Sequence, residues 1–155
     1  MKKGAGIALA TLSVLTLTAC GASGPGAPTR NIKQVTDGVE GQSRQILVRD
    51  LLLVAQPDGS AVLVGTFLNH GESADALTGI TVNNIAAKLS ATSFPLVLNT
   101  PVIFSGDTAN ASGRVPGLNI PVGSRVDITV NFQNTAPVTL SAIVRAQAEY
   151  FKNVK

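Results

Sequence analysis

One short segment carries the side chains best suited to bind a metal ion. His70, Glu72 and Asp75 lie close together in the sequence, and an imidazole with two carboxylates is a suitable donor set for a divalent cation. A solvated turn, in which Gly71 makes the bend and the acids face water, explains the same pattern and is the favoured interpretation. His70 is therefore kept as a candidate metal ligand, and the sequence predicts no cofactor.

The residue types that most enzymes use are scarce. His70 is the only imidazole, Gly-x-Ser-x-Gly does not occur, and acids such as Asp50, Asp58 and Asp107 occur singly. A serine nucleophile needs a neighbouring base, and a glycosidase needs two facing carboxylates. We expect no catalytic residue and no enzyme activity, with one alternative left open: carboxylates far apart in the sequence that face each other in the fold.

Cys20, the only cysteine, stands at the end of an export sequence. Lys2 and Lys3 precede an apolar stretch from residue 7 to residue 17, as in a secretory signal peptide, and this stretch is too short to span a bilayer. Leu-Thr-Ala-Cys at 17–20 is similar to the bacterial lipobox, in which the cysteine is diacylated and becomes the first residue. Residues 1–19 are thus a predicted lipoprotein signal peptide, and Cys20 is the predicted lipidation site.

Lipidation predicts a location and a first partner. Two acyl chains hold a protein stably at a bilayer, so we expect attachment to membrane lipid through Cys20 on the extracytoplasmic face of the cell membrane. Removal of residues 1–19 lowers the number of Lys and Arg from 12 to 10 against 9 acids, and the net charge falls from +3 to +1. A nearly neutral domain does not support nucleic acid as a partner.

Beyond the anchor, composition divides the chain into a linker and one domain. Residues 20–44 are rich in Gly and Pro near their start and show almost no apolar periodicity, which is typical of a flexible tether. Strand-like patterns begin at Gln45, so residues 45–155 are the predicted domain. Charged residues make up only 14% of the chain, which favours a compact β-rich fold over a charged helical bundle.

The domain contains many short strand patterns separated by turn residues. In the clearest one, residues 125–133, Val126, Ile128, Val130 and Phe132 alternate with polar residues. The apolar runs 46–55 and 61–68 flank Gln-Pro-Asp-Gly, a hairpin turn. Further runs are expected at 77–82, 87–89, 94–98, 102–104, 114–118 and 138–146. The sequence predicts an all-β fold, an antiparallel β-sandwich of seven to nine strands, with an aliphatic core.

The end of the chain, residues 150–155, combines aromatic and basic side chains. Tyr150, Phe151, Lys152 and Lys155 could together contact a partner or lipid headgroups. A fraying end of the last strand is the favoured interpretation.

The order of these elements resembles a known family. The Pro-Asp-Gly hairpin, the strand ending in Asn69-His70-Gly71, the acidic turn before Leu77 and the run Pro-Val-Gly-Ser-Arg-Val-Asp-Ile-Thr-Val-Asn-Phe at 121–132 are similar to the periplasmic copper chaperones of the PCu(A)C type. With the lipobox, the chain looks most like actinobacterial LpqE-type lipoproteins. The resemblance implies an immunoglobulin-like or cupredoxin-like sandwich over residues 45–147.

The family's copper chemistry does not transfer to these residues. The copper chaperones bind Cu(I) through His and Met side chains, whereas this chain has one Met, at position 1, and one His, which precedes the third strand. We expect a non-catalytic interaction or accessory module with a membrane or envelope protein as partner. The resemblance to LpqE-type lipoproteins implies association with the respiratory cytochrome bcc-aa3 supercomplex; a copper-handling or other metal-handling lipoprotein is the alternative.

Overall fold

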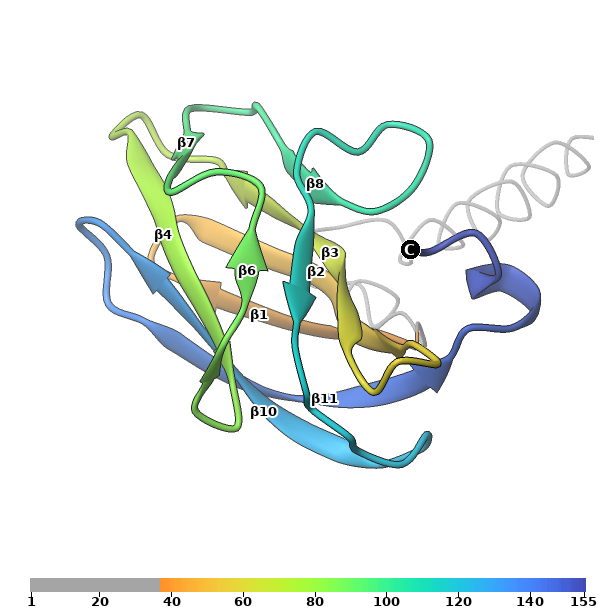
Figure 1. Cartoon of the computed structure of the whole chain (residues 1–155). Coiled ribbons are helices and arrows are strands. Elements are labelled where there is room, and N and C mark those ends of the chain that lie inside the picture. The colour runs from red at the N-terminus through yellow and green to blue at the C-terminus, as the bar shows by residue number, and fades with distance from the viewer. Residues whose placement is uncertain (1–36) are drawn as a thin grey trace, which may run out of the picture. The chain divides into compact units, whose positions relative to one another are not determined.

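Eleven strands and one 3-10 helix make up residues 37–155, the part of the chain that this computed structural model describes (Figure 1). In chain order they are β1 (Val39–Ser43), β2 (Ile46–Ala55), β3 (Ala61–Asn69), β4 (Asp75–Val82), β5 (Ile85–Ala86), β6 (Lys88–Leu89), β7 (Phe94–Leu96), β8 (Val102–Phe104), β9 (Gly113–Val115), β10 (Arg125–Phe132), β11 (Val138–Ala146) and the 3-10 helix η2 (Glu149–Phe151). The predicted all-β class is confirmed. The strands outnumber the predicted seven to nine because β1 has little apolar patterning and β5 is only two residues long, so neither gives a sequence pattern.

Strand β10 shows how the sequence pattern produces the layers. Its inward residues Val126, Ile128 and Val130 are buried, and the residues between them are exposed or half-buried. β10 pairs antiparallel with β11 on one side and with β4 on the other, so one polar row of each strand faces water.

Strand β11 joins the two layers of the fold. The hydrogen-bonded order is β5-β4-β10-β11-β2-β3-β9-β6, so β11 lies between β10 and β2. Its first part pairs antiparallel with β10, and its last residues, Val144 to Ala146, pair with β2 in parallel. The expected sandwich is therefore not wholly antiparallel, because one strand crosses from one layer to the other. Figure 1 shows the two layers facing each other, with β10 and β11 along one side.

The hairpin between β2 and β3 has the predicted turn. Gly59 adopts φ +77°, which glycine tolerates without strain, and its N–H donates to the carbonyl of Gln56. The Asp58 carboxylate accepts hydrogen bonds from the hydroxyl (2.6 Å) and the backbone N–H (3.0 Å) of Ser60. These two bonds, with the nearby charge of Arg114, hold the pKa of Asp58 below its ordinary value.

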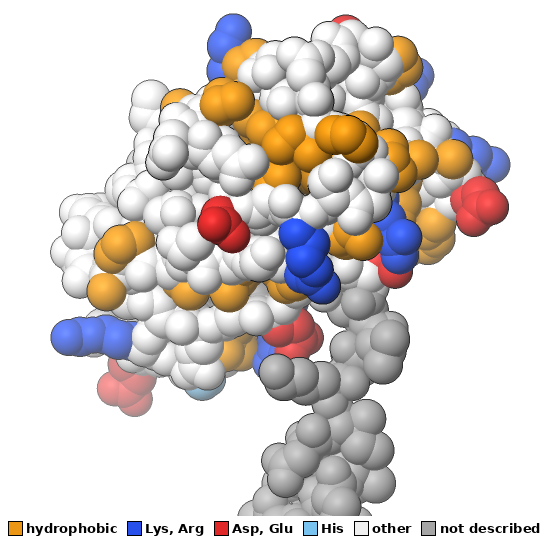
Figure 2. Space-filling model, turned by 90° about the horizontal axis from the view of Figure 1, so that it is seen from below, with side chains coloured by type: hydrophobic (Ala, Val, Ile, Leu, Met, Phe, Trp, Pro, Cys, Tyr) orange, Lys and Arg blue, Asp and Glu red, His pale blue; other side chains and the backbone are white. Residues whose placement is uncertain are grey.

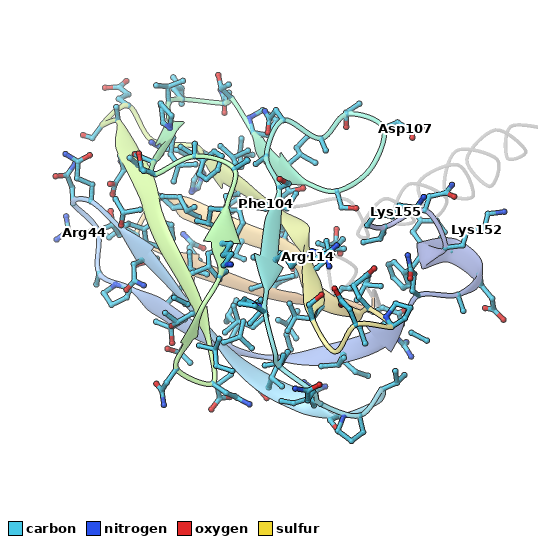
Figure 3. All side chains as sticks on the ribbon, viewed as in Figure 1. Arg44, Phe104, Asp107, Arg114, Lys152 and Lys155 are labelled. Atoms are coloured by element: carbon cyan, nitrogen blue, oxygen red, sulfur yellow. The ribbon has the colours of Figure 1, made fainter. Side chains whose placement is uncertain are left out.

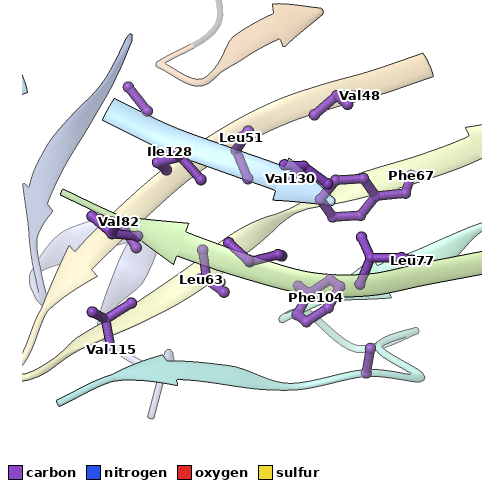
Figure 4. Packing of buried hydrophobic residues seen from close by; sticks show 14 of the residues in the cluster. Val48, Leu51, Leu63, Phe67, Leu77, Val82, Phe104, Val115, Ile128 and Val130 are labelled. Atoms are coloured by element: carbon purple, nitrogen blue, oxygen red, sulfur yellow. The ribbon is translucent and has the colours of Figure 1, made fainter. Parts of the chain in front are cut away.

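The core between the layers is aliphatic around a small aromatic group. Phe104 contacts Phe67 and Phe94 edge to face, with ring centroids 5.6 and 5.5 Å apart. Figure 4 shows Leu63 and Leu77 beside this group, and the predicted core residue Phe132 is also buried. These buried rings belong to β3, β7 and β8 and pack in the core on the inner side of the sheet.

The β structure begins before residue 45. Strand β1 lies within the segment predicted as a linker and pairs antiparallel with β2, with Ser43 opposite Ile46. Val39-Glu-Gly-Gln-Ser carries one apolar side chain, so no periodicity marks it as a strand. Position 41 has room only for glycine, because a β-carbon there would clash with a methyl carbon of Leu140 at 2.6 Å.

Candidate functional site

Two adjoining cavities form a groove on the outer side of β2 and β3. Their volumes are about 410 and 420 Å³, and both are lined by Val64, Ser105, Tyr150 and Phe151. We call this feature the C-terminal groove. Its remaining lining residues are Asp37, Gly38, Asp50, Leu52, Gly65, Thr66, Ile103 and Phe104 in the first cavity and Gly106, Asp107, Asn153 and Val154 in the second.

One wall of the groove is an irregular part of β2. The pairing of β2 with β3 shifts register between Arg49 and Leu52, and its pairing with β1 shifts over the same stretch. At this β-bulge, Asp50 adopts φ +52° and its side chain is exposed to solvent. Gly38 makes room for the bulge, since a β-carbon there would lie 2.2 Å from the carbonyl carbon of Asp50. The backbone thus places a carboxylate at the groove.

The other wall is the C-terminal segment, residues 147–155. The carbonyl of Val154 accepts hydrogen bonds from the side-chain amides of Gln147 (2.7 Å) and Gln56 (3.3 Å), which fix the segment to the end of β2. Phe151 is half-buried, whereas the Tyr150 ring is 90% exposed and meets the Phe151 ring edge to face, with centroids 5.3 Å apart. The segment therefore turns back as one wall of the groove and does not continue the last strand, which ends at Ala146.

The outer face of β2 and β3 also holds buried residues that lie outside the main core. Leu52, Val54 and Val62 are at most 4% exposed, yet they do not belong to the cluster between the layers. Leu52 lines the same cavity as Phe151. The outer face of β2 and β3 is thus apolar, and the C-terminal segment covers part of it.

The charged lining of the groove is entirely acidic. Asp37, Asp50 and Asp107 line the two cavities, and no Lys, Arg or His is among their lining residues. Asp37 forms an ion pair with Arg145, and residues 37–155 hold two further ion pairs, neither of which uses Asp50 or Asp107. Figure 3 shows Asp107 at the same side of the molecule as Lys152 and Lys155. On the face that Figure 2 shows, by contrast, acidic and basic side chains are scattered.

The predicted metal-binding residues are not brought together. His70 and Glu72 are exposed, while Asp75 is 8% exposed and belongs to β4. No group of three or more His, Cys, Asp or Glu within residues 37–155 is arranged to hold a metal ion.

Asp75 instead connects the start of β4 to the loop between β10 and β11. Its Oδ1 accepts hydrogen bonds from the backbone N–H groups of Ala76 (2.7 Å) and Asn134 (2.9 Å). Burial works to raise the pKa of Asp75, but these bonds and one from the Thr135 side chain hold it below its ordinary value. The role of Asp75 is structural.

Asn69 organises the loop that carries His70. It is fully buried, and its side-chain amide donates to the carbonyls of Ser73 (2.8 Å) and Leu96 (2.9 Å). Its Oδ1 accepts the N–H of Gly71 at 2.9 Å. The Asn-His-Gly pattern thus specifies a turn, as the favoured interpretation of the sequence expected. The expectation that both acids face water is wrong for Asp75, because its carboxylate is buried among backbone N–H donors.

Cys20, the predicted lipidation site, and the predicted signal peptide lie outside the described residues. Among residues 37–155, no helix is both long and apolar enough to cross a bilayer.

Comparisons with known proteins identify the fold. No family model matches the sequence, and no curated protein matches it. Among solved structures, the copper-bound PCuAC domain from PmoF2 matches with a TM-score of 0.60 and 19% identity over 70% of this chain and 98% of that domain. The fold is that of a PCuAC domain. The apo PCuAC domains from PmoF1 (TM-score 0.60, 18% identity, 70% and 99% covered) and PmoF2 (0.61, 18%, 72% and 98%) agree.

This PCuAC-type fold confirms part of what the family resemblance implied. The chain covers nearly the whole length of each solved domain, so the likeness is to the complete fold. Residues 37–155 of this chain contain one His and no Met. The shared architecture therefore carries a different set of side chains from one suited to soft Cu(I).

Sequence reasoning missed the C-terminal groove. Arg49 and Asp50 interrupt the apolar run of β2 with two successive polar residues, which a regular strand with one buried face does not contain. That interruption is the signal that could have indicated the bulge. Nothing in residues 147–155 indicates that they turn back over β3.

Proposed function

We propose that this protein is a membrane-anchored lipoprotein whose PCuAC-type domain is a non-catalytic interaction module at the cell envelope. The observation that carries the proposal is a copper-chaperone fold in which His70 is the only imidazole and no methionine follows Met1. The C-terminal groove, with two adjoining cavities of about 410 and 420 Å³, is the surface that we assign to the contact with a partner.

The anchor part of the proposal rests on the sequence of residues 1–20. A lipid on Cys20 would place the domain on the extracytoplasmic face of the cell membrane, joined to it by the residues that precede Asp37. The partner would then be a membrane or envelope protein within reach of that tether. The resemblance to LpqE-type lipoproteins makes the respiratory cytochrome bcc-aa3 supercomplex the partner to examine first.

The test is affinity purification of the full-length chain from its own membranes in mild detergent, after crosslinking. We expect recovery of a stoichiometric membrane partner, and we expect Cys20→Ala to move the protein out of the membrane fraction and to lose that partner. Recovery of the lipidated protein alone would contradict the interaction module. Recovery with the respiratory complex absent but another partner present would contradict only the respiratory assignment.

A copper-handling or other metal-handling lipoprotein is the second candidate. The likeness to a copper-bound PCuAC domain and the exposure of His70 favour it. It requires tight, stoichiometric Cu(I) uptake that His70→Ala abolishes. A titration of the purified protein with Cu(I) against a competing chelator decides the matter, and binding no tighter than about micromolar would exclude this candidate.

A further inference from the structure

The C-terminal groove combines aromatic rings with carboxylates that have no ion-pair partner. The exposed Tyr150 ring is supported on its edge by Phe151, so much of its surface is open to a ligand. Asp50 and Asp107 line the adjoining cavities and take part in none of the ion pairs within residues 37–155. Aromatic faces and carboxylates both attract cations, and the attraction grows as water is displaced.

Three residues at or beside the groove have an uncommon backbone conformation. Asp50 (φ +52°), Ser105 (φ +71°) and Glu149 (φ +49°) all adopt the left-handed conformation, which is uncommon for residues other than glycine. The first two line the cavities, and Glu149 directly precedes Tyr150. Such residues cluster at binding sites, where the surrounding structure holds them in place.

We propose that the C-terminal groove binds a lysine or arginine side chain presented by a protein partner, with its charge accepted by Asp50 in the first cavity or by Asp107 in the second, and with Tyr150, which lines both, covering its aliphatic stem. Charge complementarity selects this occupant, because every charged residue that lines the groove is acidic and Asp37 is already paired with Arg145. The apolar floor formed by Leu52, Val64 and Ile103 suits the methylene groups of such a side chain. This inference rests on the proposed function as an interaction module.

The test begins with a binding selection of random heptapeptides displayed on phage against the purified full-length chain. The strongest peptide is then synthesised with a fluorescent label, and its affinity is measured by anisotropy. We expect the selected peptides to share a Lys or Arg and to bind about tenfold more weakly when that residue becomes Gln, since a charge-assisted hydrogen bond is lost. Binding should also weaken as the NaCl concentration rises.

Substitutions in the protein localise the effect. Asp50→Asn and Asp107→Asn remove the charges while keeping side-chain size, and Asn, like Asp, tolerates the left-handed conformation of position 50. The double variant should lose at least about tenfold in affinity. Asp127→Asn is the matched control, because Asp127 is an exposed acid of β10 that lines neither cavity, and it should bind as the wild type does.

Several outcomes would overturn the inference. Selected peptides without a cationic residue, or binding that persists in the double variant, would exclude a basic side chain as the occupant. Self-association of the chain that the peptide disrupts would make a second copy the occupant. If the lipidated protein is recovered from membranes without a partner but still binds the peptide, only the proposed function is contradicted. The two failures can therefore be told apart.

Discussion

Replacement of Gly38 by alanine tests whether the bulge in β2 builds the C-terminal groove. The new β-carbon would lie 2.2, 2.4 and 2.5 Å from the carbonyl carbon, Cα and carbonyl oxygen of Asp50. Non-bonded carbon atoms normally stay about 3.5–4.0 Å apart, so the overlap exceeds about 1 Å. All three atoms belong to the backbone, and no rotation of a side chain relieves the clash.

The size of the effect follows from the two ways in which the chain can move. Displacing the bulge amounts to overpacking, which costs about 1–3 kcal/mol. Lifting Asp37 and residue 38 away from β2 breaks the exposed Asp37–Arg145 ion pair, which is worth about 0–1 kcal/mol. Either movement takes Asp37 or Asp50 out of the groove wall. We therefore expect Gly38→Ala to lower the free energy of unfolding by up to about 3 kcal/mol, and to weaken binding of the selected peptide when the bulge that carries Asp50 is displaced.

Urea unfolding, followed by circular dichroism, and anisotropy with the labelled peptide measure the two effects. Gly79→Ala is the control, because the nearest atom to its added β-carbon is the Asn131 side-chain nitrogen at 3.9 Å, an ordinary contact. It should leave binding intact and change stability by no more than about 0.5–1 kcal/mol. Equal stability and equal binding of Gly38→Ala and the wild type would refute the assignment of Gly38 as a support of the bulge.

Further predictions concern the core, the loops and the anchor. Phe104→Ala should lower the free energy of unfolding by about 3–5 kcal/mol, measured in urea, because Phe104 is 1% exposed and contacts two other rings. Asn69→Ala should lower the free energy of unfolding by about 1–3 kcal/mol for each hydrogen-bond partner that stays buried without a replacement. Amide hydrogen exchange should become faster in residues 70–74. The depressed pKa of Asp75 stabilises the fold above its ordinary value of 3.8, and this contribution disappears as the pH falls through the lower folded value; Asp75→Asn should therefore weaken the acid dependence of stability below about pH 4. Cys20→Ala should remove the lipid, seen as a mass change of the mature protein.

The long strands could be predicted because their burial follows a simple period. In β10 the alternation of Val126, Ile128 and Val130 with polar residues matches the buried and exposed rows. The predicted bounds 46–55 and 138–146 match β2 and β11. The Pro-Asp-Gly turn could also be predicted, because the turn requires a positive φ at Gly59, which glycine adopts readily.

The features that depend on contacts between distant segments could not be predicted. Strand β1 has too few apolar residues to show a period, and its pairing with β2 stabilises it. The groove needs the end of the chain to lie over β3, and only the hydrogen bonds to the carbonyl of Val154 reveal this arrangement. For the loop with His70, the composition suggested a metal site, whereas the buried amide of Asn69 makes it a turn.

The position of β11 between the two layers has a consequence for synthesis of the chain. Ribosomes deliver β2 long before and β10 shortly before residues 138–146, and until β11 emerges the edge of β10 and the last residues of β2 lack the partner that β11 provides. Exposed strand edges invite pairing with other chains. A nascent or prematurely terminated chain that ends before residue 138 would therefore be prone to aggregation, and the domain can close only when almost its last residues have emerged.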